Sequence, residues 1–272
     1  MKNFKAGQYV NQGTHKSFQP SEINRKWKIR DMALINLLSQ ADRQLGRLDM
    51  YSEYIPNIDL FISMHVLKEA SQSNKIEGTK TNIEDALLDR EDVNEEKKDD
   101  WEEVQNYILA LNTAIIGRLI IILYLVEKGL LKKPILYLSD FFERNRTLYY
   151  DNLTRVREKN DLIQWSKFFL VGVIETAQNS IKTFDNILKL QKEVDSKLQK
   201  LGSRANNAQI IIDYLFQRPI INAQKAKELT NLSLPTVYKL LHKIEGLGII
   251  EEVTGAKRGK LYLFKEYVKL FE

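Results

Sequence analysis

The sequence contains no cysteine, which excludes disulfide bonds, thiolate nucleophiles and cysteine-ligated metal ions. Its three histidines, His15, His65 and His242, lie far apart and show no metal-ligand spacing, so we predict no histidine metal site either. Only 5 prolines and 12 glycines interrupt the 272 residues. Because helix-breaking residues are this scarce and Leu, Ile, Lys and Glu are abundant, the composition predicts a mainly α fold.

A long apolar run is also missing. The longest, residues 115–126, is too short to span a bilayer and is interrupted by Gly117 and Arg118. The first 20 residues lack the apolar core of a secretion signal. We therefore expect a cytoplasmic protein with no membrane partner. The chain is long enough for one large domain or two ordinary ones.

Charge is distributed unevenly, although the net charge is only +5. Residues 203–272 contain 11 Lys and Arg against 7 Asp and Glu, so most of the positive excess lies in the last quarter. Residues 84–103 contain 11 acidic residues against 3 basic ones. The basic quarter favours a polyanionic partner, whereas the acidic segment is expected to be a solvated connector, because like charges at this density repel.

Apolar residues at helical spacing predict helices along most of the chain, after an extended N-terminal arm of about 25 residues. Ser21, with Asn24, is expected to cap a helix that runs to about Leu48. Residues 115–126 are apolar on nearly every side, as in a helix enclosed by its neighbours, and Gly129 should end it. Further helices are predicted at 57–71, 81–88, 101–112, 135–142, 148–158, 162–186 and 187–201.

The last part of the chain changes in pattern. Helices are predicted at 205–216, at 223–230 behind an Asn222 cap, and from Pro235 to Glu245. Strand-like runs follow at 249–253 and 261–264, joined by a basic turn that contains glycine. Two strands around such a turn, after a helix-turn-helix, predict a winged helix.

The second helix of this helix-turn-helix and the basic turn carry side chains suited to DNA. Cations can contact phosphates, whereas hydroxyl groups can bond to phosphates or base edges. Winged helices also serve as dimerisation or protein-docking modules, and that alternative stays open. The candidate DNA-binding residues are Ser233, Thr236, Tyr238, Lys239, His242, Lys243, Lys257, Arg258 and Lys260.

Eight segments, taken in order, carry a resemblance to a known family. They are ADRQLGRLDM (41–50), PNIDLF (56–61), KEASQSNKIEGT (68–79), NYILALNTAI (106–115), IGRLIIILYLVEKGLL (116–131), PILYLSDFFERNRTLYYDNL (134–153), RVREKNDLIQWSKFFLVGV (155–173) and IEGLGIIEEVTG (244–255). They resemble the Fic (filamentation induced by cAMP) family, in the subclass with an N-terminal inhibitory helix and a C-terminal winged helix, and the resemblance covers almost the whole chain. It implies a mainly α fold: a Fic-like helical bundle followed by a winged helix-turn-helix domain with a small β-hairpin.

The resemblance also implies a division of the chain. Residues 1–100 would form the N-terminal module with its inhibitory helix, and 101–186 would retain helices of the family's core. Residues 187–204 would be a helical linker and 205–272 the winged-helix domain. Within the first module, Ser73, Glu77 and Gly78 match the inhibitory motif (S/T)xxxE(G/N).

Family members transfer AMP from ATP to a Ser, Thr or Tyr hydroxyl of a target protein. Their signature, HxFx(D/E)GNGRxxR, supplies a general base, a metal carboxylate and a nest for the phosphates. No stretch of this chain contains GNGR, and only Arg118 corresponds to the motif's second arginine. The chain therefore resembles an internally deleted Fic protein, for which we expect no catalytic residue, no metal and no cofactor. If the native protein contains the missing segment, we expect it to use ATP and Mg²⁺ as cofactors.

In the family, the inhibitory glutamate pairs with that second arginine, which implies a contact between Glu77 and Arg118. The alternative is that Ser73 and Gly78 simply end a helix and that Glu77 is a solvated charge. The leading hypothesis is a non-catalytic regulatory or signalling module that binds DNA or a protein partner through its winged helix. The alternative is a protein adenylyltransferase (AMPylator). A protein target, an antitoxin-like partner and a homodimer stay open.

Overall fold

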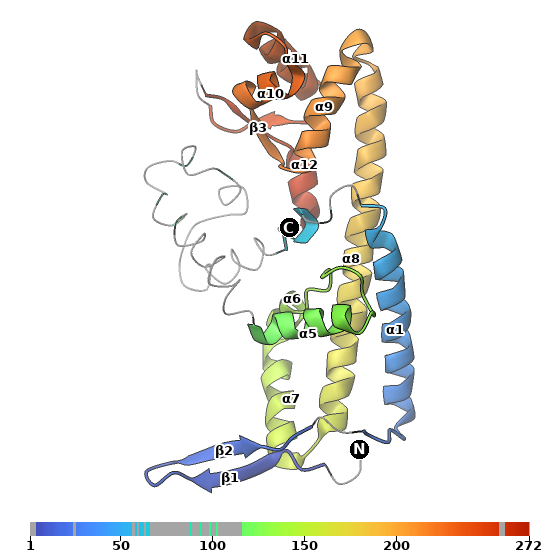
Figure 1. Ribbon diagram of the computed structural model, residues 1–272, viewed down its shortest axis with the longest axis vertical. Helices are drawn as coiled ribbons and strands as arrows, with labels where there is room; N and C mark the ends of the chain where they lie inside the picture. The colour runs from blue at the N-terminus through green and yellow to red at the C-terminus, as the bar shows by residue number, and fades with distance from the viewer. Residues whose placement is uncertain are drawn as a thin grey trace. The chain divides into compact units, whose positions relative to one another are not determined.

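The structure is a computed structural model of the 272-residue chain. It describes residues 4–23, 26–55, 58, 60–62, 64–65, 88, 93, 98, 102, 116–255 and 259–271, without the side chains of 116–120 and 139. The described part is mainly helical, with small antiparallel sheets (Figure 1). It divides into two compact units, one of Met1–Met50 and Ile121–Ile181, the other of Tyr51–Ile120 and Lys182–Glu272.

The first unit begins with a β-hairpin, where an extended arm was predicted. Strands β1 (Gly7–Asn11) and β2 (Lys16–Pro20) pair antiparallel, and Tyr9 lies opposite Phe18 with ring centroids 5.3 Å apart. The turn is closed by a hydrogen bond from Gln12 N to His15 O of 2.8 Å. The prediction was wrong because each strand is only 5 residues long and an aromatic cross-strand pair, rather than a long alternating pattern, supports the pairing.

Helix α1 (Met32–Ser52) begins later than predicted, since residues 26–31 are not helical. Its cap is Asp31, whose Oδ1 accepts a hydrogen bond of 2.8 Å from Leu34 N, so the predicted cap at Ser21 and Asn24 is wrong. The apolar spacing predicted the helix but only part of its buried face. Leu45 and Leu48 are buried as expected, whereas Met32, Ile35 and Leu38 are exposed. The buried face consists of Leu34, Ala41, Leu45 and Leu48.

Helix α5 (Ile116–Glu127) ends at the predicted glycine. Gly129 has φ +67°. Leu130 N donates to Leu125 O, five residues earlier, at 2.9 Å, which is the hydrogen bond that defines a Schellman motif. The predicted enclosure is wrong, because Leu123 and Tyr124 are 56% and 54% exposed. An apolar surface on every side of a helix is compatible with burial, but the sequence of the helix does not show whether other elements pack against each side.

Helix α6 (Ser139–Arg144) is followed by α7 (Arg146–Lys159) and α8 (Leu162–Gln199). The helix predicted at 135–142 is wrong in its first part, because residues 135–138 are not helical, although Ile135 and Leu136 are fully buried there. Helix α8 is a single helix of 38 residues where two were predicted. Neither Gly nor Pro interrupts its second half, so nothing in the sequence ends it at 186.

An aromatic cluster forms the core between α6, α7 and α8, and consists of Phe141, Phe142, Tyr149, Trp165 and Phe168. Gly172 of α8 is buried beside it. A Cβ atom at Gly172 would lie 2.6 Å from Cδ1 of Phe141, a distance that real contacts do not reach. The close approach of helix backbone and ring therefore requires glycine at this position.

In the second unit, the chain leaves α8 and forms a domain of helices and strands. Its elements in order are η3 (Gly202–Arg204), α9 (Ala205–Leu215), β3 (Ile220–Asn222), α10 (Ala223–Thr230), α11 (Leu234–Gly246), β4 (Glu251–Glu252), β5 (Leu261–Leu263), α12 (Lys265–Val268) and η4 (Lys269–Phe271). The three strands form one antiparallel sheet in the order β3-β5-β4, in which Tyr262 pairs with both Ile221 and Glu252. The three longer helices and the last two strands were predicted from the sequence; β3 was not.

Candidate nucleic-acid interface

Helices α10 and α11 are joined by a short link whose ends are set by local residue chemistry. Asn222 caps α10, because its Oδ1 accepts a hydrogen bond of 2.8 Å from Lys225 N. Asn231, in the left-handed conformation with φ 55°, ends the helix. Ser233 is extended and Pro235 lies in the first turn of α11, where a missing N–H costs nothing. The predicted cap at Asn222 and the start near Pro235 are confirmed.

Helix α11 has one buried face and one exposed face. The buried face carries Val237, Leu240, Leu241 and Ile244, whose spacing is that of a helix packed on a core. The exposed face carries the side chains that were predicted to contact DNA. On it, Tyr238 is 39% exposed and the His242 side chain is 85% exposed, and the exposed residues of this set are Thr236, Tyr238, Lys239, His242 and Lys243.

Two hydroxyl groups lie at the start of α11. The Ser233 and Thr236 side-chain oxygens are 2.8 Å apart and share a hydrogen bond at the exposed end of the helix. Ser233 and Pro235 are both exposed, and Leu234 between them is half-buried. The structure thus brings six of the predicted residues together, five on α11 and Ser233 directly before it. Of the other three, Lys260 directly precedes β5, whereas Lys257 and Arg258 lie outside the described residues.

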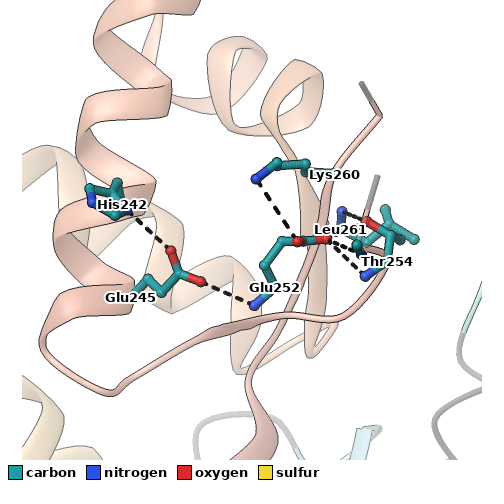
Figure 2. Close-up of polar contacts among 7 residues, drawn as sticks. His242, Glu245, Glu252, Thr254, Lys260 and Leu261 are labelled. Carbon is teal, nitrogen blue, oxygen red and sulfur yellow. Dashed lines mark hydrogen bonds and ion pairs between the residues drawn. The ribbon is translucent and has the colours of Figure 1, made fainter. Parts of the chain in front are cut away.

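The strands after α11 carry acidic residues that no sequence motif indicated. Figure 2 shows Glu252 of β4 pointing toward Thr254 and Lys260. Its Oε1 accepts hydrogen bonds from Thr254 N at 2.8 Å, from Gly255 N at 3.0 Å and from the Thr254 hydroxyl. Its Oε2 lies 3.9 Å from Lys260 Nζ. These bonds, led by the one from the Thr254 hydroxyl, outweigh desolvation and lower the pKa of Glu252.

Glu245 connects α11 to the same strand. One carboxylate oxygen lies 3.3 Å from His242 Nδ1, and the other accepts a hydrogen bond of 3.4 Å from Glu252 N (Figure 2). Tyr262 is buried in β5. Burial, followed by the negative charges of Glu245 and Glu252, raises the pKa of Tyr262. The sequence alone does not reveal that Glu252 lies opposite Tyr262, because the pairing of β4 with β5 brings them together.

The predicted inhibitory site cannot be placed in the same way. Ser73, Glu77 and Gly78 lie outside the described residues, and Arg118 lies on α5 in the stretch whose side chains are not described. The contact between Glu77 and Arg118 therefore stays a prediction. Among the residues that the structure describes, no group of His, Asp and Glu could hold a metal ion. Within the same residues, no helix is long and apolar enough to cross a membrane.

The N-terminal part of the chain is similar to a known family. Residues 35–116 match the model of the Fic/DOC family N-terminal domain. The match includes most of α1 and the segments at 41–50, 56–61 and 68–79 on which the predicted resemblance rests at this end of the chain. The N-terminal part of the resemblance is confirmed. The match ends at 116, so helices α6 to α8 and the elements from η3 to η4 lie beyond it.

Proposed function

We propose that residues 205–272 form a winged helix that binds double-stranded DNA, and that the chain acts as a non-catalytic regulatory or signalling module. The order helix, strand, helix, helix, strand, strand from α9 to β5 supports the fold. The observation that carries the function is the exposed face of α11. It gathers two lysines, a histidine, a tyrosine and two hydroxyl groups, while the opposite face is buried.

These side chains suit the major groove of DNA. With 13 residues, α11 is about 20 Å long, which is sufficient to cross a groove about 12 Å wide. Lys239 and Lys243 would contact phosphates, and Tyr238 and His242 would reach phosphates or base edges. Lys260 would contact the backbone from the turn between β4 and β5, which is the wing of the proposed domain.

The two acidic residues of β4 have cationic partners, which reduces their repulsion of a phosphate. Glu251 pairs with Lys265 at 2.9 Å and Glu252 lies 3.9 Å from Lys260. Glu245 shares its carboxylate between His242 and a backbone N–H. A neutralised carboxylate repels a phosphate less than a free one, so the lysines of α11 determine the local potential.

The proposal predicts salt-dependent binding to duplex DNA of random sequence. The logarithm of the association constant should fall linearly with the logarithm of the salt concentration between about 50 and 200 mM. Lys239→Ala and Lys243→Ala should each weaken binding and reduce that slope by about 1, because each removes one phosphate contact. Fluorescence anisotropy with a labelled duplex measures both quantities.

The control variant is Lys192→Ala, which removes an exposed lysine of α8 outside the proposed domain. It should leave the affinity and the slope unchanged. If the native protein does not bind DNA even at low ionic strength, DNA binding is excluded. Self-association of the native chain through the same face would then favour a dimerisation module.

The alternative function is protein adenylyl transfer, completed by a segment or a second chain that supplies the missing signature. The match of residues 35–116 to the Fic/DOC family N-terminal domain is the observation that favours it. Incubation of the chain with labelled ATP, Mg²⁺ and candidate target proteins tests it. Efficient labelling of a target would overturn the non-catalytic part of the proposal without affecting DNA binding.

A further inference from the structure

We propose that Glu252 is a positioning residue, whose carboxylate orders the turn directly after β4 and presents Lys260 to the DNA backbone. The wing is here the segment from Glu252 to Leu261, of which residues 252–255 and 259–261 are described. The inference rests on the proposed DNA binding. It assigns a role to a carboxylate that, by charge alone, would be expected to weaken such binding.

The first observation is the number of donors that converge on one oxygen. Glu252 Oε1 accepts from two consecutive backbone N–H groups, Thr254 N and Gly255 N, and from the Thr254 hydroxyl. The side chain is only 16% exposed. Charge-assisted bonds of this kind are about twice as strong as neutral ones. Three of them within two residues fix the direction in which the chain leaves β4, before Gly255 with φ +64°.

The second observation is that the same network reaches the other side of the wing. The Thr254 hydroxyl donates to Glu252 and accepts a hydrogen bond of 3.5 Å from Leu261 N, the first residue of β5. Glu252 Oε2 faces Lys260, the residue before that strand. One carboxylate therefore connects the outgoing strand, the turn and the residue that precedes the returning strand (Figure 2).

The third observation links the wing to α11. Glu252 N donates to Glu245 Oε1 at 3.4 Å, and Glu245 Oε2 lies 3.3 Å from His242 on the exposed face of the helix. The position of the wing strand is thereby set relative to the helix that is proposed to enter the groove. The two proposed DNA-binding elements are held together as one surface before binding, so less conformational entropy is lost when DNA binds.

The proposal predicts a change opposite to that expected from charge. Removing a carboxylate near a polyanion should strengthen binding if the group acts only as a charge. If Glu252 positions the wing, Glu252→Ala should instead weaken binding to duplex DNA by about 3- to 10-fold, the effect of losing one net hydrogen bond or slightly more. Glu252→Gln keeps an acceptor at Oε1 and removes the charge, so its affinity should equal or exceed that of the native protein.

The matched control is Glu251→Ala, on the same strand. It removes the same charge, but its carboxylate pairs with Lys265 and makes no contact with the turn that the structure describes. This variant should bind DNA as well as the native protein or more tightly. Thr254→Val provides a second variant that keeps the carboxylate and removes only the hydroxyl, with its hydrogen bonds to Glu252 and Leu261. It should weaken binding less than Glu252→Ala.

Amide hydrogen exchange in the absence of DNA separates this proposal from the proposed function. Exchange at Thr254 and Gly255 should become faster in Glu252→Ala and stay unchanged in Glu251→Ala. Tighter DNA binding by Glu252→Ala, or unchanged exchange at both amides, would overturn the positioning role. Failure of the native protein to bind DNA would overturn the proposed function and the presentation of Lys260, while the exchange rates would still decide whether Glu252 orders the turn.

Discussion

At the scale of single residues, Asp31 shows how one carboxylate serves two purposes. It caps α1 through Leu34 N and pairs with Lys167 of α8, whose Nζ lies 2.9 Å from Oδ2. The hydrogen bond from Lys167, followed by that from Leu34 N, lowers the pKa of Asp31. Both side chains are about one quarter exposed, so the pair is screened by solvent only in part.

Asp31 is predicted to contribute to stability in a pH-dependent way. Because its pKa is lower in the folded protein than the unfolded value of about 3.9, the contribution is present above that value and is lost as the pH falls through the folded pKa. Urea unfolding at several pH values should therefore show Asp31→Asn less stable than the native protein at neutral pH, with a difference that disappears in acid. Asp42→Asn, at an exposed position of α1, is the control and should show no such convergence.

Prediction from sequence succeeded where a single residue decides a boundary. Asn222, Pro235 and Gly129 each have a backbone requirement that few other residues meet, and each ends or starts a helix as expected. It failed at α1, where Ser21 and Asp31 are both good caps. Only the tertiary contact with Lys167, which lies 136 residues away, distinguishes them.

At the scale of elements, the cap of α10 supports the helix-turn-helix. Asn222→Ala should lower the free energy of unfolding by about 1 kcal/mol, because Lys225 N loses its hydrogen-bond partner. Asn222→Asp should retain most of the stability, since a carboxylate also accepts this bond and interacts well with a helix N-terminus. Chemical denaturation measures both changes.

The control for the cap is Gln224→Ala, at an exposed position of the same helix. It should change the stability by a few tenths of a kcal/mol at most. Equal losses in Asn222→Ala and Gln224→Ala would contradict the role of Asn222 as a cap.

The candidate site was predictable only in part at this scale. The helical period assigns Tyr238, Lys239 and His242 to one face, because the apolar residues Val237 and Leu240 mark the opposite face, which the structure shows to be buried. Glu245 and Glu252 were missed. The contact of Glu252 with Lys260 depends on the pairing of β4 with β5, whose register two short strands do not specify in the sequence.

At the scale of the whole molecule, the second unit contains an aromatic cluster from distant parts of the chain. Phe61 lies 4.5 Å from Phe184 of α8 and 5.9 Å from Phe271, measured between ring centroids. Tyr267 continues the cluster, 5.5 Å from Phe271 and 5.1 Å from Phe216. Phe61, which lies within the part that matches the Fic/DOC family N-terminal domain, therefore shares a core with the end of the chain, which local patterns could not predict.

Tyr267 is predicted to make this unit sensitive to alkali. Burial raises the pKa of Tyr267 well above its usual value, so the folded state holds the proton more tightly than the unfolded state. Its contribution is fully present below about pH 10 and is lost as the pH rises further. Thermal unfolding at increasing pH should show this loss, and Tyr267→Phe should reduce it. Tyr54→Phe, at a position 67% exposed, is the control and should behave like the native protein.

The contact between Gly172 and the ring of Phe141 has an evolutionary consequence. Because a Cβ atom at 172 would overlap the ring at 2.6 Å, neither position can change freely while the other is kept. Relatives that carry alanine at 172 are expected to carry a smaller side chain at 141. The two positions, 31 residues apart in the sequence, should therefore covary, and this covariation would identify the packing of α6 on α8 from homologous sequences alone.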